Sequence, residues 1–198
     1  MIVYGESAPY GKRKVIDATT IPQPANFYGD SKLQADVAVR ELADDTYKVI
    51  VLRPPMIYGK GSKGNYRTLA KLAKKLPIFP NVDNERSMLY IENLCEFLCQ
   101  IILIKSYARN SVVLLPQNGE WTKTSDMVKE IAKASGKRIA ELKCFAPAVW
   151  IGSKMPGKIG GLVNKAFGNN FYNKRISHYD GLNYQLISVK KSIVKTEE

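Results

Sequence analysis

The segment NFYGDSKLQAD, residues 26–36, places a tyrosine and a lysine four residues apart, at Tyr28 and Lys32. In an α-helix, residues at this spacing lie one turn apart on the same face. An ammonium group held beside a phenol stabilises the phenolate form, which can take a proton from an alcohol. The pair is therefore a candidate proton shuttle for converting an alcohol into a ketone. The alternative is a solvated surface pair, because this spacing also arises by chance.

The sequence around this pair predicts an alternating α/β architecture. The run YKVIVLRP, residues 47–54, is continuous and rich in β-branched residues, which is typical of a strand covered on both faces. Alternation of such strands with helical segments indicates a parallel sheet. We expect further strands at residues 1–4, 87–91 and 112–116, and helices at residues 28–43, 66–76, 92–104 and 125–134.

From residue 144 onward the pattern changes to apolar residues interleaved with lysines and glycines. A helix on a membrane surface is one interpretation of this composition. Pro147, Pro156 and several glycines divide the segment into short pieces, which favours small helices that cover a site. No run reaches the roughly 20 apolar residues of a membrane span.

Composition narrows the classes of function further. The three cysteines, Cys95, Cys99 and Cys144, are too few for a disulfide framework, which favours a reducing, cytoplasmic setting. Cys95 and Cys99 lie one helical turn apart, but His178 is the only histidine, so we expect buried thiols and no metal site. The formal net charge of +12 comes from scattered basic residues without interleaved aromatic residues. This pattern indicates a lysine-rich surface and not a nucleic-acid site.

Gly59, Gly61 and Gly64 form a G-x-G-x-x-G pattern between a strand and a helix. Such a pattern can bind a dinucleotide when its turn begins at the end of the strand. Here two prolines and three further residues separate the glycines from the strand. The sequence therefore favours a loop that binds the phosphate of a substrate through a helix N-terminus.

Taken in order, these segments resemble the extended short-chain dehydrogenase/reductase family, the NAD-dependent nucleotide-sugar epimerases and dehydratases. The resemblance is carried by VYG at 3–5, YGDSK at 28–32, LRPPMIYGKG at 52–61, GNYRTLAKLAKK at 64–75 and NERSMLYIENL at 84–94. It implies an α/β, Rossmann-like parallel sheet with a small, mostly helical C-terminal region that binds substrate.

The resemblance implies roles for residues on the cofactor side of the site. Tyr28 would be the catalytic base, and Lys32 its partner, which also bonds the nicotinamide ribose. Pro54 and Ile57 would lie near the nicotinamide. The cofactor would be NAD, with NADP as the alternative.

The resemblance also implies roles on the substrate side, where a nucleotide-diphosphate sugar would bind. Met56 would lie near the sugar, and Asn65 and Arg86 would bind the diphosphate. A guanidinium suits this role because its planar donors match phosphate oxygens. One departure is Asn93, which stands where the family often has aspartate.

The first residues of the chain bear on the type of reaction. Dehydratases of the family carry two acids where this sequence has Met1 and Ile2, so elimination of water is disfavoured. The resemblance therefore implies a UDP-glucose 4-epimerase-like enzyme that forms a 4-keto intermediate, with surface polysaccharide synthesis as the natural pathway. The alternatives are a 4-keto-sugar reductase, a remnant that binds sugar nucleotides or acts as a scaffold without catalysis, and a basic interaction module.

The resemblance also implies an organisation for the chain. Residues 1–143 would form the later part of the Rossmann-like domain, with a substrate loop at 54–92, and residues 144–198 would form the substrate-binding cap. The family's glycine-rich cofactor turn and its catalytic serine or threonine would precede residue 1, so we expect a truncated chain that is incomplete and inactive by itself. An exposed sheet edge would then favour a homo-oligomer or another association.

Overall fold

The computed structural model describes residues 2–3, 15–17, 19–104 and 109–198, and it divides the chain into two compact units. Unit 1 consists of Met1–Ile57, Ser87–Gly119 and Asn170–Ile187. Unit 2 consists of Tyr58–Arg86, Glu120–Asn169 and Ser188–Glu198. The family boundary predicted at residue 143 is a different division, and it stays a prediction.

Unit 1 is built on a parallel sheet with strand order β1-β3-β7. Strand β3 (Val49–Leu52) lies between β1 (Ile2–Val3) and β7 (Ser111–Leu114). Its side chains alternate between the two faces: Val49 and Val51 belong to a cluster with Val39 and Ala43, whereas Leu52 packs with residues of a second helix. The predicted strand with both faces covered is confirmed.

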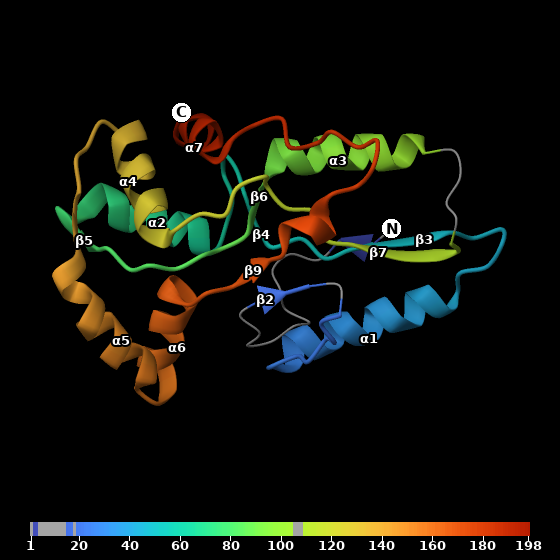
Figure 1. Cartoon of the computed structure of the whole chain (residues 1–198), viewed down its shortest axis with the longest axis horizontal. Helices are drawn as coiled ribbons and strands as arrows, with labels where there is room; N and C mark the ends of the chain where they lie inside the picture. The colour runs from blue at the N-terminus through green and yellow to red at the C-terminus, as the bar shows by residue number, and fades with distance from the viewer. Residues whose placement is uncertain (1, 4–14, 18, 105–108) are drawn as a thin grey trace. The chain divides into compact units, whose positions relative to one another are not determined.

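Helix α1 (Phe27–Glu41) covers one face of this sheet and α3 (Ile91–Leu103) covers the other (Figure 1). Helix α1 begins at Asn26, whose side chain accepts a hydrogen bond of 2.8 Å from the Gly29 backbone N–H. Asp30 in the first turn and Arg40 in the last turn both complement the helix dipole. The predicted helix that carries Tyr28 and Lys32 is thus present.

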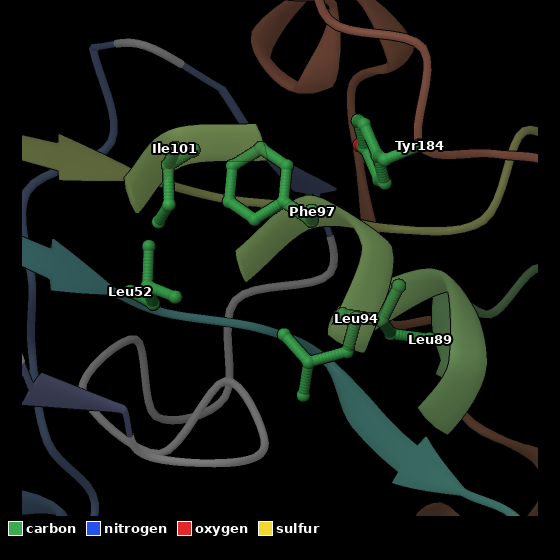
Figure 2. Close-up of a cluster of buried hydrophobic side chains, with 6 residues drawn as sticks. All are labelled: Leu52, Leu89, Leu94, Phe97, Ile101 and Tyr184. Atoms are coloured by element: carbon green, nitrogen blue, oxygen red, sulfur yellow. The ribbon is translucent and has the colours of Figure 1, made fainter. Parts of the chain in front are cut away.

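The main hydrophobic core of unit 1 lies between β3, α3 and the segment of residues 179–184. Figure 2 shows Phe97 of α3 between Leu52 and Tyr184, with Ile101 next to Leu52. The ring centroids of Phe97 and Tyr184 are 4.7 Å apart. The buried face of α3 consists of Asn93, Leu94, Phe97 and Ile101.

The prediction that Cys95 and Cys99 are buried is wrong. Both thiols are exposed, as is Cys144. An apolar helix still buries only one stripe of residues, and in α3 that stripe passes through positions 94, 97 and 101. Among the described residues, no group of histidine, cysteine and acidic side chains could hold a metal ion.

The chain returns to unit 1 through β9 (Phe171–Tyr172), which pairs in parallel with β2 (Val15–Ile16), and through η3 (Lys174–Ser177). Buried Asn93 holds this returning segment. Its Nδ2 donates to the Asn118 side chain at 3.0 Å and to the Ile187 carbonyl at 2.9 Å, and its Oδ1 accepts from the Ile187 N–H at 3.0 Å. An aspartate has no N–H to make the first two bonds, which gives this departure from the family pattern a structural reason.

Unit 2 combines helices with a short parallel strand pair. Strand β5 (Ile78–Pro80) pairs with β8 (Ala140–Leu142), and α4 (Thr124–Ala134) packs against α2 (Asn65–Lys75) and α7 (Val189–Glu197). The rest of the unit is η2 (Lys143–Phe145), α5 (Ala146–Lys154) and α6 (Gly157–Phe167), the short helices predicted from the prolines and glycines. Strands β4 (Met56–Tyr58) and β6 (Met88–Tyr90) form a separate pair.

Helix α7 is held on unit 2 by a buried polar cluster. The Tyr66 hydroxyl donates to Glu197 Oε1 at 2.8 Å, and Lys74 Nζ lies 2.6 Å from Glu197 Oε2. The Tyr66 ring stacks on Tyr58 with centroids 5.2 Å apart, and the Tyr58 hydroxyl is hydrogen-bonded to Ser192 of α7. Burial, together with the neighbouring Glu197 carboxylate, raises the pKa of Tyr66 far above its usual range.

This raised pKa predicts a loss of stability at alkaline pH. Above the ordinary tyrosine pKa near 10, Tyr66 ionises in the unfolded chain first, so the unfolded state binds fewer protons and is favoured as pH rises. We expect the free energy of unfolding to fall by up to about 1.4 kcal/mol per pH unit from this one group. Urea unfolding between pH 9 and 11 measures the slope, which Tyr66→Phe should flatten. Exposed Tyr47 is the control, and an equal flattening by Tyr47→Phe would contradict the assignment.

Across the described residues, none of the helices combines the length and the apolar character needed to cross a membrane.

Candidate active site

Tyr28 and Lys32 lie side by side on the first turns of α1. Tyr28 is 53% exposed, and Lys32 Nζ lies 5.6 Å from the centroid of the Tyr28 ring. Within the described part of the chain, the Tyr28 hydroxyl makes no hydrogen bond to a side chain. The structure thus places the two groups together with the phenol open to a ligand.

A buried ion pair fixes α1 against the end of β3. Asp36 of α1 is fully buried and Arg53 is 5% exposed, and Asp36 Oδ2 accepts from Arg53 Nε at 2.8 Å and Nη2 at 2.5 Å. Arg40 Nε donates to the other carboxylate oxygen at 2.5 Å. This pair was not predicted from the sequence. Two features of the sequence could have indicated it. An arginine, Arg53, directly follows the apolar run of residues 49–52, and an aspartate, Asp36, lies two helical turns after Tyr28.

The direction of α1 brings Tyr28 to the carboxyl edge of the sheet. Strands β1 and β3 are parallel and α1 follows β1 in the chain, so the helix runs back along the sheet and begins where the strands end (Figure 1). In open α/β sheets, ligands bind beyond this edge. Tyr28 is therefore placed where the fold class puts reacting groups.

The segment after β3 leads from the buried Arg53 to the predicted cofactor residues. Pro54 is buried, and Met56 and Ile57 are half-buried, with Ile57 packed against the core cluster of Leu52 and Phe97. The Arg53 carbonyl accepts a hydrogen bond of 2.9 Å from the Tyr172 hydroxyl. This segment gives the carboxyl edge an apolar surface in the same unit as Tyr28.

The two predicted diphosphate ligands, Asn65 and Arg86, belong to unit 2. Asn65 is the first residue of α2 and follows Gly64, which has a φ of 96°. Arg86 Nη1 donates to the carbonyls of Lys165 at 2.6 Å and Ala166 at 3.4 Å, at the end of α6. Tyr28 belongs to unit 1, and the roles of Asn65 and Arg86 in the same site stay predictions.

The glycine loop joins β4 to α2. Its residues form a turn in which the Ser62 N–H donates to the Gly59 carbonyl at 3.0 Å, and Gly61 has a φ of 73°. Positive φ at Gly61 and Gly64 explains why glycine stands at both positions. The loop leads to the N-terminus of an eleven-residue helix, and the positive end of a helix dipole favours a phosphate.

A separate polar pocket of about 290 Å³ lies in unit 1, and none of the predicted site residues lines it. Lys174, Arg175 and His178 contribute basic groups to its wall. Its inner polar groups bond to the protein: the Gln117 side chain accepts from Ser87, and the Asn118 side chain accepts from the Tyr90 N–H at 3.0 Å. These bonds give the inner wall a structural role.

The residues of unit 1 fit one end of a nicotinamide cofactor. The exposed phenol and the adjacent ammonium supply hydrogen-bonding groups, and the segment from Pro54 to Ile57 supplies apolar side chains in the same unit. Tyr28 and Lys32 would hold the ribose, and Pro54 and Ile57 would contact the nicotinamide ring. These assignments are proposals.

Comparison with known families identifies the family of this chain. Residues 6–148, more than half of the chain, match the family described as RmlD substrate binding domain. The chain belongs to this family. Together with the relatives below, the match places the chain among the extended short-chain dehydrogenase/reductase proteins of the NAD-dependent epimerase type, as the sequence resemblance predicted.

Two curated relatives are epimerases. A UDP-glucose 4-epimerase of Vibrio cholerae is 34% identical over 118 residues, which cover 58% of this chain and 35% of the relative. An N-acetyl-alpha-D-glucosaminyl-diphospho-ditrans,octacis-undecaprenol 4-epimerase of Escherichia coli O157:H7 is 28% identical over 147 residues, which cover 68% of this chain and 44% of the relative. The chain thus spans less than half the length of either relative.

Solved structures share the fold. A UDP-glucuronic acid 4-epimerase from Bacillus cereus in complex with NAD has a TM-score of 0.65 at 16% identity, covering 98% of this chain and 57% of that one. A dTDP-4-dehydrorhamnose reductase from Bacillus anthracis in complex with NADP has a TM-score of 0.55 at 22% identity, covering 71% of this chain and 48% of that one. At these identities the likeness establishes the Rossmann-like fold, which confirms the predicted fold class.

Proposed function

We propose that the chain carries the proton-transfer pair and part of the substrate site of an NAD-dependent nucleotide-sugar 4-epimerase. The observation that carries the proposal is the exposed Tyr28 phenol with the Lys32 ammonium beside it, at the carboxyl edge of the parallel sheet. The epimerase relatives, at 34% and 28% identity, support the same class of reaction.

In the proposed reaction, the Tyr28 phenolate accepts the proton of the sugar C4 hydroxyl as C4 becomes a ketone. Lys32 stabilises the phenolate through its positive charge. The chemistry that NAD supplies when bound is acceptance of the C4 hydride and its return to the opposite face of the ketone. Tyr28 then donates its proton to the C4 oxygen, which restores the phenolate and leaves the alcohol inverted.

Binding of the substrate is proposed to rest on Asn65 and Arg86, with Met56 beside the sugar. The UDP-glucose named for the Vibrio relative is the first substrate to test. Loss of a charge-assisted hydrogen bond to a phosphate costs roughly 1.5–3 kcal/mol, which corresponds to roughly a 10- to 100-fold loss of affinity.

Isothermal titration of the chain with UDP-glucose, with NAD and with both ligands tests these assignments. We expect UDP-glucose to bind without NAD, and Asn65→Ala and Arg86→Ala to weaken this binding by roughly 10- to 100-fold. Arg67→Ala is the matched control, because Arg67 is exposed on the same helix as Asn65. Circular dichroism must show that Arg86→Ala keeps its fold. Absence of binding, or an equal effect of Arg67→Ala, would argue against the substrate assignments.

The reaction itself is tested by incubating the chain with NAD and UDP-glucose and separating UDP-galactose by anion-exchange chromatography. Conversion that Tyr28→Phe lowers about 100-fold or more supports Tyr28 as the base. Conversion that survives this substitution places the base elsewhere. NAD binding that depends on the Gly59–Gly64 loop would identify that loop as a cofactor site.

A 4-keto-sugar reductase is the second candidate, because a dTDP-4-dehydrorhamnose reductase is among the proteins that share the fold. In that reaction Tyr28 donates a proton to a ketone that is reduced once, with no return step. Net oxidation of NADPH by a 4-keto sugar nucleotide, without interconversion of UDP-glucose and UDP-galactose, distinguishes it from the epimerase.

A further inference from the structure

The short helices of unit 2 expose an unusually apolar face. Helix α5 has no buried residue, although it contains tryptophan, valine and isoleucine. Four large apolar side chains at and beside it are exposed, Phe145 by 42%, Trp150 by 65%, Ile151 by 59% and Met155 by 45%. Isolated apolar residues are normal on a protein surface, but a cluster of this kind usually marks a contact site.

This face is held in place by packing on the opposite side of α5. Helices α5 and α6 lie side by side (Figure 1), and a Cβ added at Gly152 would contact the Val163 side chain at 3.4 Å. Asn164 Nδ2 of α6 donates to the Ser153 carbonyl at 2.8 Å. Because Gly152 and Ser153 face α6, the helix presents Trp150 and Ile151 outward.

The sequence of the segment that forms this face carries only positive charges. Residues 142–169 contain four lysines, at 143, 154, 158 and 165, and no aspartate or glutamate. Lys143 and Lys154 are exposed, and Lys154 Nζ lies 5.8 Å from the centroid of the Trp150 ring. The acid before this segment, Glu141, forms a salt bridge with Lys129, whose Nζ lies 3.0 Å from Glu141 Oε2. Exposed lysines beside exposed apolar residues are complementary to a surface that is apolar and anionic.

We propose that the outward face of α5 formed by Trp150 and Ile151, with Met155 at the end of the helix, docks on an anionic lipid surface. A tryptophan at such a surface places its apolar ring at the headgroup level, and flanking lysines extend to the phosphates. Helix α5 has nine residues, about 14 Å, and so lies in the interface plane. A second copy of the chain is a poor occupant, because it brings the same lysines and a net charge of +12. The inference is independent of the proposed reaction.

Vesicle flotation tests the proposal with the whole chain, because bound protein floats whereas aggregated protein sinks. We expect the chain to float with vesicles made of equal parts phosphatidylcholine and phosphatidylglycerol, but not with phosphatidylcholine alone. In a Trp121→Phe background, Trp150 emission should shift to the blue on binding. High salt should release the chain, because it screens the lysine contacts.

Substitutions locate the contact. We expect Trp150→Ser with Ile151→Ser to weaken binding about tenfold or more, and Lys143→Gln with Lys154→Gln to weaken it about fivefold for each lysine. The matched control is Ile102→Ser with Leu103→Ser, which removes side chains that are 69% and 77% exposed at the end of α3. This control should bind as the unchanged chain does, and circular dichroism verifies the fold of every variant.

Three results would overturn the proposal. The first is no flotation with anionic vesicles, and the second is an equal loss in the α3 control. The third is that the face serves another partner: either single-stranded DNA binds as tightly as the vesicles at the same salt, or a dimer seen in size-exclusion chromatography disappears with Trp150→Ser.

Discussion

Replacing Asp36 with alanine is expected to lower the free energy of unfolding by about 3–5 kcal/mol. Asp36 is fully buried, and its carboxylate is the partner of Arg53 Nε and Nη2 at 2.8 and 2.5 Å. Without it, the Arg53 guanidinium remains 5% exposed at the end of β3 with its countercharge gone. Urea unfolding at pH 7, followed by circular dichroism, measures the loss.

The control for Asp36 is Asp45, an aspartate whose side chain is 98% exposed and whose Oδ1 lies 4.0 Å from Lys48 Nζ. Asp45→Ala should cost about 0.5 kcal/mol, as is usual for a surface pair. Replacing both partners, Asp36→Leu with Arg53→Met, should cost much less than Asp36→Ala, because no unpaired charge stays buried. If Asp36→Ala is no more harmful than Asp45→Ala, the pair does not hold α1 on the sheet.

The same pair matters for the proposed chemistry. It fastens the middle of α1 at the strand end from which the segment of Pro54 and Ile57 begins, while Tyr28 lies two turns earlier on the helix. Asp36→Ala should therefore disturb the position of Tyr28 without removing any group that touches a ligand.

Replacing Gly160 with alanine is expected to cost about 3 kcal/mol of stability. A Cβ at this position would lie 1.9 Å from the Met155 carbonyl oxygen and 3.0 Å from its carbon, and both are backbone atoms that cannot rotate away. The turn between α5 and α6 must then open. Thermal and urea unfolding of the variant measure the cost.

The neighbouring glycine, Gly161, supplies a control in which the same substitution should raise stability instead of lowering it. Gly161 lies on the same helix, and nothing stands within 4 Å of a Cβ added there. Gly161→Ala should stabilise the helix by about 0.8–1.0 kcal/mol, because alanine is the better helix former. Two substitutions of equal chemistry at adjacent positions thus have opposite expected effects. A stabilising Gly160→Ala would show that the α5–α6 packing differs from the structure described.

Local patterns in the sequence were sufficient for the parallel strands and the longer helices and for the family, but not for short strands such as β5 and β8 or for α7. The β-branched run before Arg53 forms β3, and the segment after Asn26 forms α1, because hydrophobic period and capping act over a few residues. The Tyr28–Lys32 pair follows from helix geometry alone, since residues four apart on a helix are always neighbours. Prolines and glycines likewise predicted that residues 144–168 form short helices.

Other features depend on contacts between distant parts of the chain, which no local pattern encodes. Three hydrogen-bonded pairs illustrate this: Asp36 with Arg53, Asn93 with Ile187, and Tyr58 with Ser192 of α7. Their partners are 17, 94 and 134 residues apart in the sequence. Burial of Cys95 was predicted from an apolar segment, but the tertiary structure alone decided which stripe of α3 faces the core. The exposed face of α5 has the same origin: the sequence determined that the helix is apolar, and packing on α6 decided which side chains it leaves exposed.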